Sequence, residues 1–372
     1  MDTTEKKVLF TATDAQGNER SGYVDANTNS EAMQKLEENG FTDILLHYDA
    51  INCAHRDDLD GLNEQELERI ANIELKSMTG MSSGALFAQA LKQNWLFISF
   101  GLLGCAWGVY DRSAFFFVLG GIVALIAPVI SLKNLITLSQ YNKLQEADAF
   151  GEYEHALSLI KKLKPKLKAP EMAFDLDVRH ASIMAKKGDI EGAFDLLAPW
   201  QQEFEAMSPG MYESRAAVIY YISGDFESLL GMMRDAYAKS DNNQTILLDL
   251  ILMEARYGDV NNAQELMSNI ELHLLPPIYL PFLDWIEGLI ASRNNDPSAS
   301  KSLSSAVSQM LEYGDNPITL TMLALMTGSY ARELLRAGDD EGAKKVLQKI
   351  WPVLKENGDQ QTLKELSPLM EG

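Results

Sequence analysis

Few residues in this chain have the types and spacing that metal binding or catalysis requires. Its five histidines are His47, His55, His155, His180 and His273, and no HExxH pair, nucleophile elbow, Walker loop or dinucleotide fingerprint accompanies them. His47, Cys53 and His55 lie close enough in sequence to share a metal, but no fourth ligand has the spacing of a structural zinc site. The sequence therefore predicts no metal ligands.

Three other groups of residues resemble possible sites. The acids of "RDDLDG" (Arg56 to Gly61) do not alternate as in a calcium loop, so we expect a solvated helix start there. Asn243 begins a glycosylation acceptor that is inert on the cytoplasmic side of a membrane. A last group could line a ligand groove but is better explained as core packing, namely Tyr220, Tyr221, Met232 and Met233. We expect no catalytic or cofactor-binding residue and no enzyme activity.

Composition limits the classes of partner. The 372 residues allow two or three domains, and an apolar fraction of 46% suffices for packed cores. The 53 acidic and 32 basic residues give a net charge of −21, which repels the phosphates of nucleic acids. Cys53 and Cys105 lie far apart and imply no disulfide framework, which fits a reducing compartment.

Residues 93–133 form the most apolar interval of the chain. Between Lys92 and Lys133 the only charges are Asp111 and Arg112, which leave charge-free stretches of 18 and 20 residues on either side. A helix of this length crosses a hydrocarbon core of roughly 30 Å. The interval predicts a two-helix transmembrane hairpin; the alternative is a buried helical hairpin in a soluble protein.

The charges around the hairpin predict its orientation. Four lysines flank its outer ends, against a single Arg112 at the tip: Lys76, Lys92, Lys133 and Lys143. This bias favours cytoplasmic termini, and the start of the chain lacks the apolar core of a secretory signal. We expect a multi-pass protein of the bacterial inner membrane with both termini in the cytoplasm.

Glycines occur in both predicted spans, and they are Gly101, Gly104 and Gly108 in the first and Gly120 and Gly121 in the second. Such residues let helix backbones approach closely. They predict packing within the hairpin, or alternatively packing against a partner subunit.

A single basic block, "KKLKPKLK", stands out in this acidic chain, and its lysines are Lys161, Lys162, Lys164, Lys166 and Lys168. The block could lie against anionic lipid, where each lysine contributes about 1 kcal/mol. It could equally be a solvated helix end and loop.

Residues 1–50 predict a small ββαβ module. Val8 to Ala26 alternate as two strands around the turn "DAQGN", Thr28 and Glu31 form a capping box, and Phe41 opens a third strand. In the order and spacing of these features, residues 8–48 resemble the N-terminal module of the inner-membrane platform protein of type II secretion and type IV pilus machines. The resemblance implies a module on the cytoplasmic side that binds other proteins.

A repeat follows the hairpin. Glycine followed by an acid recurs at Gly151, Gly188, Gly224, Gly258 and Gly338, at intervals of 37, 36, 34 and 80 residues. The long interval is near two periods, and Asn295-Asp296 stands where a degraded copy would fall. The residues five positions after these glycines are Ala156, Ala193, Leu229, Ala263 and Ala343. The residues seven positions before Gly188, Gly224 and Gly338 are Ala181, Ala217 and Ala331.

Over residues 141–351 this pattern resembles the tetratricopeptide repeat (TPR), although its aromatic positions are patchy and "LLPPIYLPF" departs from it. The resemblance implies antiparallel helix pairs stacked into one superhelix. The predicted fold is mainly α, with domains at 1–50 (ββαβ module), 51–92 (hydrophilic helical connector), 93–133 (transmembrane hairpin) and 134–372 (TPR-like α-solenoid).

This organisation predicts a membrane-anchored, non-catalytic scaffold. Its partners would be other proteins, bound in the concave groove of the repeats and by the N-terminal module, with the bilayer around residues 93–133 and no nucleic acid. The acidic excess favours a basic or amphipathic partner segment. The alternative is an assembly subunit of an envelope secretion or pilus-type machine; a third possibility is an enzyme with an unfamiliar site.

Overall fold

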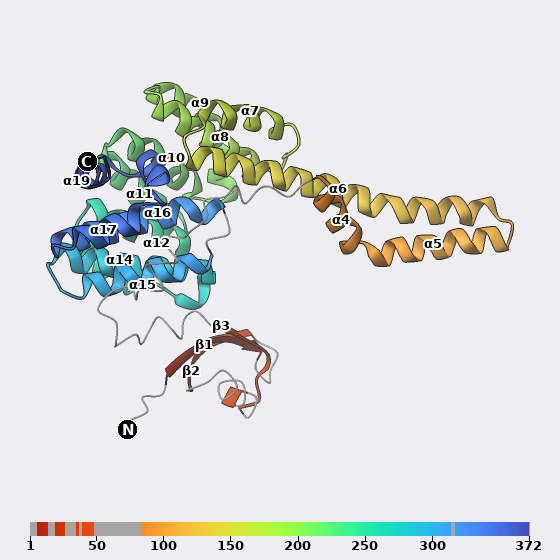
Figure 1. Cartoon of the computed structure of the whole chain (residues 1–372), viewed down its shortest axis with the longest axis horizontal. Coiled ribbons are helices and arrows are strands. Elements are labelled where there is room, and N and C mark those ends of the chain that lie inside the picture. The colour runs from red at the N-terminus through yellow and green to blue at the C-terminus, as the bar shows by residue number, and fades with distance from the viewer. Residues whose placement is uncertain are drawn as a thin grey trace. The chain divides into compact units, whose positions relative to one another are not determined.

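The computed structural model describes residues 6–13, 19–26, 35–36, 39–47, 83–313 and 317–371. The expectations for Cys53, His55, "RDDLDG" and the capping box fall outside these residues. The described chain is mainly α, as predicted, with sixteen α-helices numbered α4 to α19 (Figure 1). Most of it divides into a compact unit of Leu75–His180 and a second compact unit that contains Ala181–Asp315 and Thr319–Gly372.

The N-terminal strands form one antiparallel sheet in the order β2-β1-β3. Strand β1 (Lys6–Thr13) pairs with β2 (Glu19–Ala26) in a register that puts Val8 opposite Val24, and with β3 (Thr42–His47) along its other edge. Between β2 and β3 the expected helix is described only at Lys35 and Leu36, and Leu36 is buried. All three strands belong to this one sheet.

Three helices make up the apolar part of the first unit: α4 (Ser83–Gln93), α5 (Trp95–Tyr110) and α6 (Ala114–Ala149). Helix α6 continues for 36 residues, straight past Lys133 where the hairpin was expected to end. No glycine or proline follows Pro128 within α6, so nothing in that stretch ends a helix. A helix of that length is about 54 Å long.

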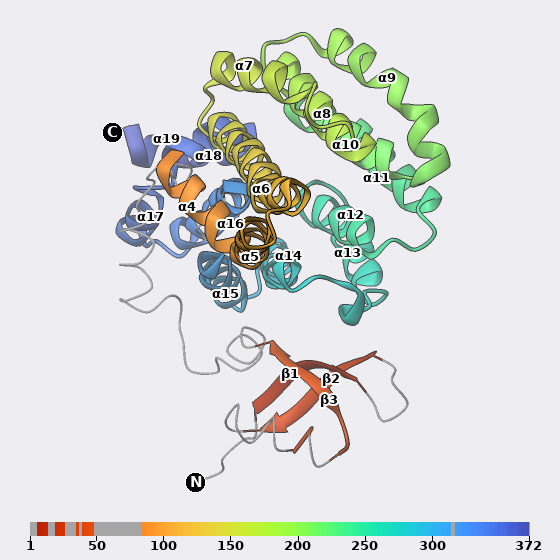
Figure 2. The ribbon, with the colours of Figure 1, turned by 90° about the vertical axis from the view of Figure 1, so that its right-hand side faces the viewer.

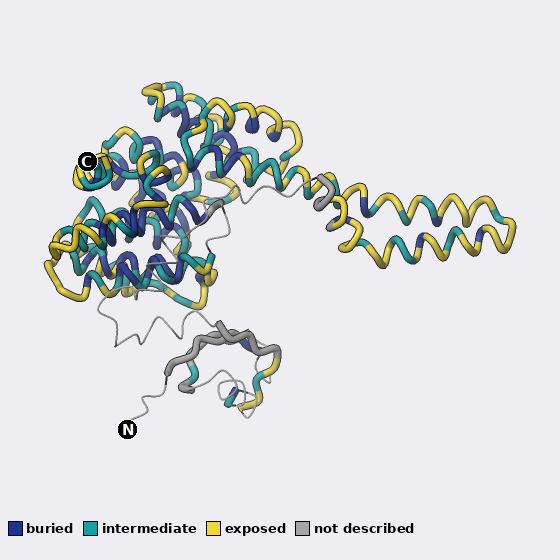
Figure 3. Tube along the Cα trace, in the orientation of Figure 1, coloured by how far each residue is buried: buried dark blue, intermediate teal, exposed yellow. Residues whose placement is uncertain are grey.

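The surface of α5 and of the first half of α6 is apolar and exposed (Figure 3). In α6 the most apolar window has a mean hydropathy of 2.6 and is only 17% buried. Helix α6 is long and apolar enough to cross a membrane, whereas α5 is a shorter apolar helix. A buried hairpin of a soluble protein would cover these faces, and within the described residues they are uncovered.

Two further helices complete the first unit. Helix α6 ends at Ala149, and α7 (Tyr153–Leu163) packs back along it after a turn at Gly151 (Figure 1). Helix α8 (Pro170–Lys186) follows and leads into the second unit at residue 181.

In the second unit successive helices pack against their neighbours along the chain and follow one another in an arc from α9 to α15 (Figure 2). Two short 3₁₀ turns, Leu272–Leu274 and Pro277–Tyr279, occupy the proline-rich stretch that departs from the repeat pattern. The helices are α9 (Ile190–Met207), α10 (Met211–Ser223), α11 (Phe226–Lys239), α12 (Gln244–Tyr257), α13 (Val260–Met267), α14 (Leu280–Arg293), α15 (Ala299–Glu312), α16 (Pro317–Arg336), α17 (Asp340–Leu347), α18 (Trp351–Asn357) and α19 (Gln360–Glu371).

The recurring Gly-acid pair is a helix stop followed by a helix start. Glycines 151, 188, 224 and 338 have positive φ angles of 73°, 91°, 76° and 82°, which end one helix in a left-handed residue. The next residue caps the following helix in several copies, as Asp189 accepts a hydrogen bond from the backbone N–H of Gly192 at 3.0 Å. Gly258 departs, with a φ of −104°.

The degraded copy in the long interval keeps this geometry. Asn295 has a φ of 56°, and the side chain of Asp296 accepts a hydrogen bond from the backbone N–H of Ser298 at 2.9 Å. Asparagine tolerates the left-handed region better than most residues, which explains the substitution. The interval of 80 residues therefore spans two repeat units, with the turn at Asn295-Asp296 between them.

The positions that the repeat pattern singles out, all of them alanine except Leu229, are buried. The residues five positions after each glycine are at most 2% exposed, and those seven positions before are at most 1% exposed: Ala156, Ala193, Leu229, Ala263, Ala343, Ala181, Ala217 and Ala331. These eight positions therefore lie in the core of the helical region.

Candidate functional site

Glycines hold the two helices of the hairpin in backbone contact. A Cβ atom on Gly120 would lie 2.5 Å from the backbone nitrogen of Cys105 and 2.6 Å from the carbonyl oxygen of Gly101. A Cβ on Gly108 would lie 2.3 Å from the backbone nitrogen of Phe117. Packing within the hairpin, the first of the two predicted alternatives, is thus confirmed for these glycines. Gly121 differs, because a Cβ there would meet nothing within 4 Å.

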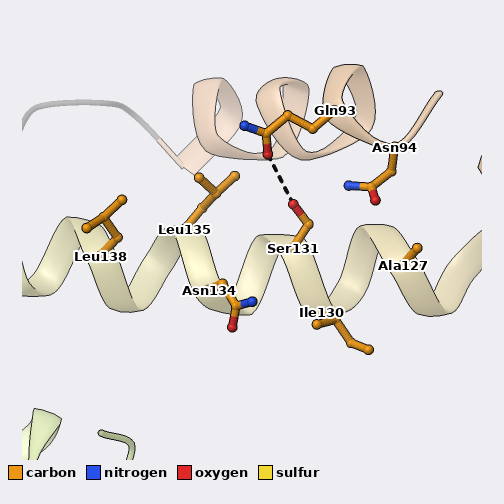
Figure 4. Close-up of a pocket in the computed structure, with 8 residues that line it drawn as sticks. All are labelled: Gln93, Asn94, Ala127, Ile130, Ser131, Asn134, Leu135 and Leu138. Carbon is orange, nitrogen blue, oxygen red and sulfur yellow. Dashed lines mark hydrogen bonds between the residues drawn. The ribbon is translucent and has the colours of Figure 1, made fainter. Parts of the chain in front are cut away.

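A shallow pocket of about 600 Å³ lies between α4 and α6 (Figure 4). The hydroxyl of Ser131 donates a hydrogen bond to Oε1 of Gln93 at 3.2 Å across it. Four polar and four apolar side chains line the pocket: Gln93, Asn94, Ser131, Asn134, Ala127, Ile130, Leu135 and Leu138. Ser131 is the first polar side chain of α6, so this mixed lining marks the end of the wholly apolar stretch of the helix.

A half-buried polar cluster joins the far half of α6 to α8. The hydroxyl of Tyr141 donates a hydrogen bond to Asp175 at 2.6 Å, and Nε of Arg179 donates to the same carboxylate at 3.0 Å. Arg179 also forms an ion pair with Asp148 at 3.3 Å and lies 5.6 Å from the centroid of the Tyr141 ring. Burial works to lower the pKa of Arg179, but the two carboxylates raise it above its usual value, so the guanidinium stays charged.

The five lysines of the basic block divide into two kinds. Nζ of Lys164 donates to the carboxylate of Asp177 on α8 at 2.7 Å, and Nζ of Lys166 donates to Oε1 of Gln140 on α6 at 2.8 Å. These two contacts fix the loop after α7 against its neighbours. All five side chains are exposed, that of Lys164 by 51%, so the division rests on these two contacts alone.

In the second unit, the turn between α18 and α19 lies against the ends of three helices that are distant in sequence. Nη2 of Arg256, at the end of α12, donates to Oδ2 of Asp359 at 2.8 Å. The hydroxyl of Tyr221, at the end of α10, donates to the carbonyl oxygen of Asn357 at 3.0 Å, and Nζ of Lys186, at the end of α8, donates to its side-chain oxygen at 3.2 Å. We call this turn, residues 357–359, the closing turn.

The Arg256–Asp359 ion pair is deeply buried, with side chains only 7% and 4% exposed. Aromatic rings surround the guanidinium, whose carbon lies 4.9 Å from the Tyr257 centroid, 5.7 Å from that of Tyr221 and 5.4 Å from that of Trp285. Burial works to raise the pKa of Asp359, but the charge of Arg256 and hydrogen bonds outweigh it and hold the pKa below its usual range.

Sequence reasoning missed this pair because its members are 103 residues apart, although Asp359 is the acid of a further Gly-acid dipeptide, Gly358-Asp359. It also missed Glu254, which occupies the repeat position of Tyr220 and is fully buried. Glu254 pairs with Arg234 at 2.7 Å and accepts a hydrogen bond from the backbone N–H of Asp259 at 3.1 Å. A charged residue at an otherwise apolar repeat position was the one available signal.

The residues weighed as a ligand groove are core residues. Met233 belongs to a buried cluster, and the three others pack against it: Tyr220, Tyr221 and Met232. Asp249 has a raised pKa, to about 6, because burial outweighs the attraction of Arg215. No group of three or more His, Cys, Asp or Glu residues that could hold a metal occurs in the part of the chain that the structure describes.

Comparisons with protein families and with curated proteins supply no further indication. A scan against protein-family models found no match to this chain, and a search of curated proteins found no relative. Function must therefore be inferred from the hairpin, the helix pairs and the closing turn.

Proposed function

We propose that this chain is a membrane-anchored, non-catalytic scaffold that holds protein partners at the cytoplasmic face of a bacterial inner membrane. In this proposal α5 and α6 cross the bilayer as a hairpin, and both termini lie in the cytoplasm. The single observation that carries it is the exposed apolar surface of α5 and of the first half of α6. Helix α6 itself then continues without a break to Ala149, within the region of the repeat.

The dimensions of the hairpin support a membrane anchor. The apolar half of α6, from Ala114 to Leu132, is about 28 Å long, close to the thickness of a hydrocarbon core. Helix α5 has 16 residues, about 24 Å, and Trp95, Trp107 and Tyr110 near its ends suit the headgroup region. The lysines at the outer ends favour cytoplasmic termini.

The helix pairs support a TPR-like repeat domain that binds proteins. The left-handed glycines, the capping aspartates and the buried small residues recur with the predicted period. Stacked helix pairs expose long surfaces and carry no requirement for catalytic groups. The acidic excess of the chain favours a partner segment that is basic or amphipathic.

Protease accessibility tests the topology. Inner-membrane vesicles turned inside out should lose both the N-terminal module and the helical repeat to added protease, while the α5–α6 hairpin survives. Right-side-out vesicles should protect both soluble parts. Survival of either part in inverted vesicles, with a known cytoplasmic domain digested as the control, would refute the proposed topology.

The second candidate is an assembly subunit of an envelope machine of the secretion or pilus type. The outward faces of the hairpin are apolar enough for other membrane helices, and Gly121 leaves one such face free of contacts within 4 Å. Affinity capture at native expression levels separates the two candidates. A machine subunit copurifies with membrane proteins in fixed stoichiometry, whereas a scaffold retains soluble partners that salt can strip.

A further inference from the structure

We propose that Lys161, Lys162 and Lys168 form a lipid-binding ledge that rests on the anionic headgroups of the membrane beside α6, while Lys164 and Lys166 only hold the ledge in place. The inference rests on the proposed membrane anchor. It goes beyond that anchor in assigning a lipid class and in separating the roles of the five lysines.

The height of the ledge follows from the continuity of α6. The apolar half of the helix ends at Lys133, beside the polar contact of Ser131 with Gln93. Gln140 lies seven residues farther along the same helix, which is at most about 10 Å from that level. Headgroups extend roughly 5–7 Å beyond the hydrocarbon, so Gln140 lies just above them.

Helix α7 returns the basic block toward this level. It packs along α6 in the reverse direction, so that its end at Leu163 lies nearer the apolar half than its start does (Figure 1). The hydrogen bond from Lys166 to Gln140, at 2.8 Å, fixes the loop at that height. The ion pair of Lys164 with Asp177, at 2.7 Å, ties the loop to α8 from the other side.

The three remaining lysines are then positioned within the reach of lipid charge. Their side chains are exposed on the last turn of α7 and in the loop that follows. The Debye length in physiological salt is about 8 Å, so charges at this height still interact with an anionic surface. The net charge of −21 makes a basic ledge exceptional in this protein, and its place next to the bilayer favours lipid over an acidic protein partner.

Lysine acetylation measured by mass spectrometry tests the ledge in the full-length protein. The chain is reconstituted in vesicles of phosphatidylcholine alone, or of equal parts phosphatidylcholine and phosphatidylglycerol. We expect the three ledge lysines to react at least about threefold more slowly on the anionic vesicles, since a surface potential near −30 mV concentrates protons by that factor. The difference should vanish at about 1 M salt, where the Debye length is about 3 Å.

The same molecules contain an internal control. Lys344 on α17 and Lys349 just after it are exposed and lie in the second unit. Equal reactivity of the ledge lysines on both kinds of vesicle would overturn the proposal, as would a slowing no larger than that of these two lysines. Protection seen in native membranes but absent from the anionic vesicles would assign the ledge to an acidic protein and would also overturn it.

A set of variants tests the same point through lipid composition. Patches excised from native membranes with a polymer should contain less anionic lipid around K161Q/K162Q/K168Q than around the wild type. The matched control K344Q/K345Q/K349Q removes the same charge elsewhere and should match the wild type; equal retention by both triple variants would count against the ledge. Extraction by alkaline carbonate separates a failure of the membrane anchor from a failure of the ledge. A chain that carbonate extracts from the membrane refutes the anchor. A chain that stays in the membrane, but whose ledge lysines react equally on both kinds of vesicle, refutes the ledge alone.

Discussion

Neutralising Asp359 should release the closing turn from the helix ends it covers. The carboxylate is 4% exposed and lies 2.8 Å from Arg256, which is itself 7% exposed. In the wild type, Oδ1 of Asp359 accepts a hydrogen bond from the backbone N–H of Thr362 at 2.9 Å. Asp359→Asn keeps the size of the side chain and an oxygen that can accept this bond. The substitution therefore removes the charge while keeping the helix start, and it leaves Arg256 buried without its counterion.

Asp359→Asn changes one heavy atom of the side chain, but we expect it to cost much of the free energy that keeps α18 and α19 closed. Removing one partner of a buried ion pair typically costs 3–5 kcal/mol, and because asparagine still accepts a hydrogen bond we expect about 3 kcal/mol here. Each 1.4 kcal/mol is a factor of ten, so the opening equilibrium of α18 and α19 should rise by about 100-fold. The aromatic rings around Arg256 are present in both forms and do not offset this loss.

Hydrogen exchange of the amides of α18 and α19 measures this opening directly, without assuming that the whole chain unfolds in one step. The matched control is the ion pair of Lys355 with Glu371, which joins the same two helices at 3.0 Å but is more than half exposed on both sides. Glu371→Gln should change exchange by less than about fivefold, because exposed pairs contribute 0–1 kcal/mol.

Two results would refute this reasoning. If the amides of α18 and α19 exchange no faster in Asp359→Asn than in Glu371→Gln, the buried pair does not hold the turn. The double variant Arg256→Met with Asp359→Leu has no buried charge left and should exchange more slowly than either single variant. If it exchanges faster, packing rather than charge holds the turn.

The remaining predictions concern the hairpin, one buried acid and one repeat turn. Gly120→Val should lower the melting temperature of the detergent-solubilised chain because its side chain meets α5 backbone, whereas Gly121→Val should leave the melting temperature unchanged. Asp249 has a folded pKa near 6, above the unfolded value near 4, so its contribution to stability is fully present below pH 4 and is lost as pH rises through 6. Asp249→Asn should therefore increase the free energy of unfolding at pH 8 by up to about 3 kcal/mol and raise the melting temperature there. At pH 4 the same substitution should leave the melting temperature unchanged. Gly188→Ala, at a φ of 91°, and Asp189→Ala should each cost about 1 kcal/mol in thermal unfolding, and no loss in either would contradict the turn described above.

The pH dependence of the closing turn has the opposite sign to that of Asp249. Because the pKa of Asp359 is held below its usual range, its contribution is present above the unfolded pKa, near 4, and is lost as pH falls through the folded value. Exchange in α18 and α19 of the wild type should therefore rise only in strong acid, and Asp359→Asn should remove that rise. An equal rise in the variant would assign the acid sensitivity to other carboxylates.

The parts of the fold that sequence predicted are those with local causes. Gly188 ends a helix and Asp189 starts the next because backbone angles and capping are decided within a few residues, and the period then repeats them. The same local chemistry identified Asn295-Asp296 as a turn despite the lost glycine. Small residues at crossings could be located by counting from these turns.

The parts that sequence could not predict depend on distant contacts or on the length of a helix beyond its apolar run. The charge of Lys133 marked the end of the apolar run, but charge does not end a helix, and α6 runs on to Ala149. Nothing in the sequence relates Arg256 to Asp359, because their contact requires the intervening helices to bring the closing turn back. Contacts of this range are decided by the stacking of all the pairs between them.

The closing turn changes what the repeat region can offer a partner. Partners were expected to bind in the concave groove of the repeats, and the ends of α8, α10 and α12 are already contacted by the chain's own residues 357–359. A partner that docks on this row of ends must displace the turn and break the buried pair, which would lower its affinity by about 100-fold if the cost is about 3 kcal/mol. A partner that docks elsewhere along the helices meets no such cost. Asp359→Asn should then strengthen binding of the first kind of partner and leave the second unchanged, so a single variant distinguishes the two docking surfaces once a partner is in hand.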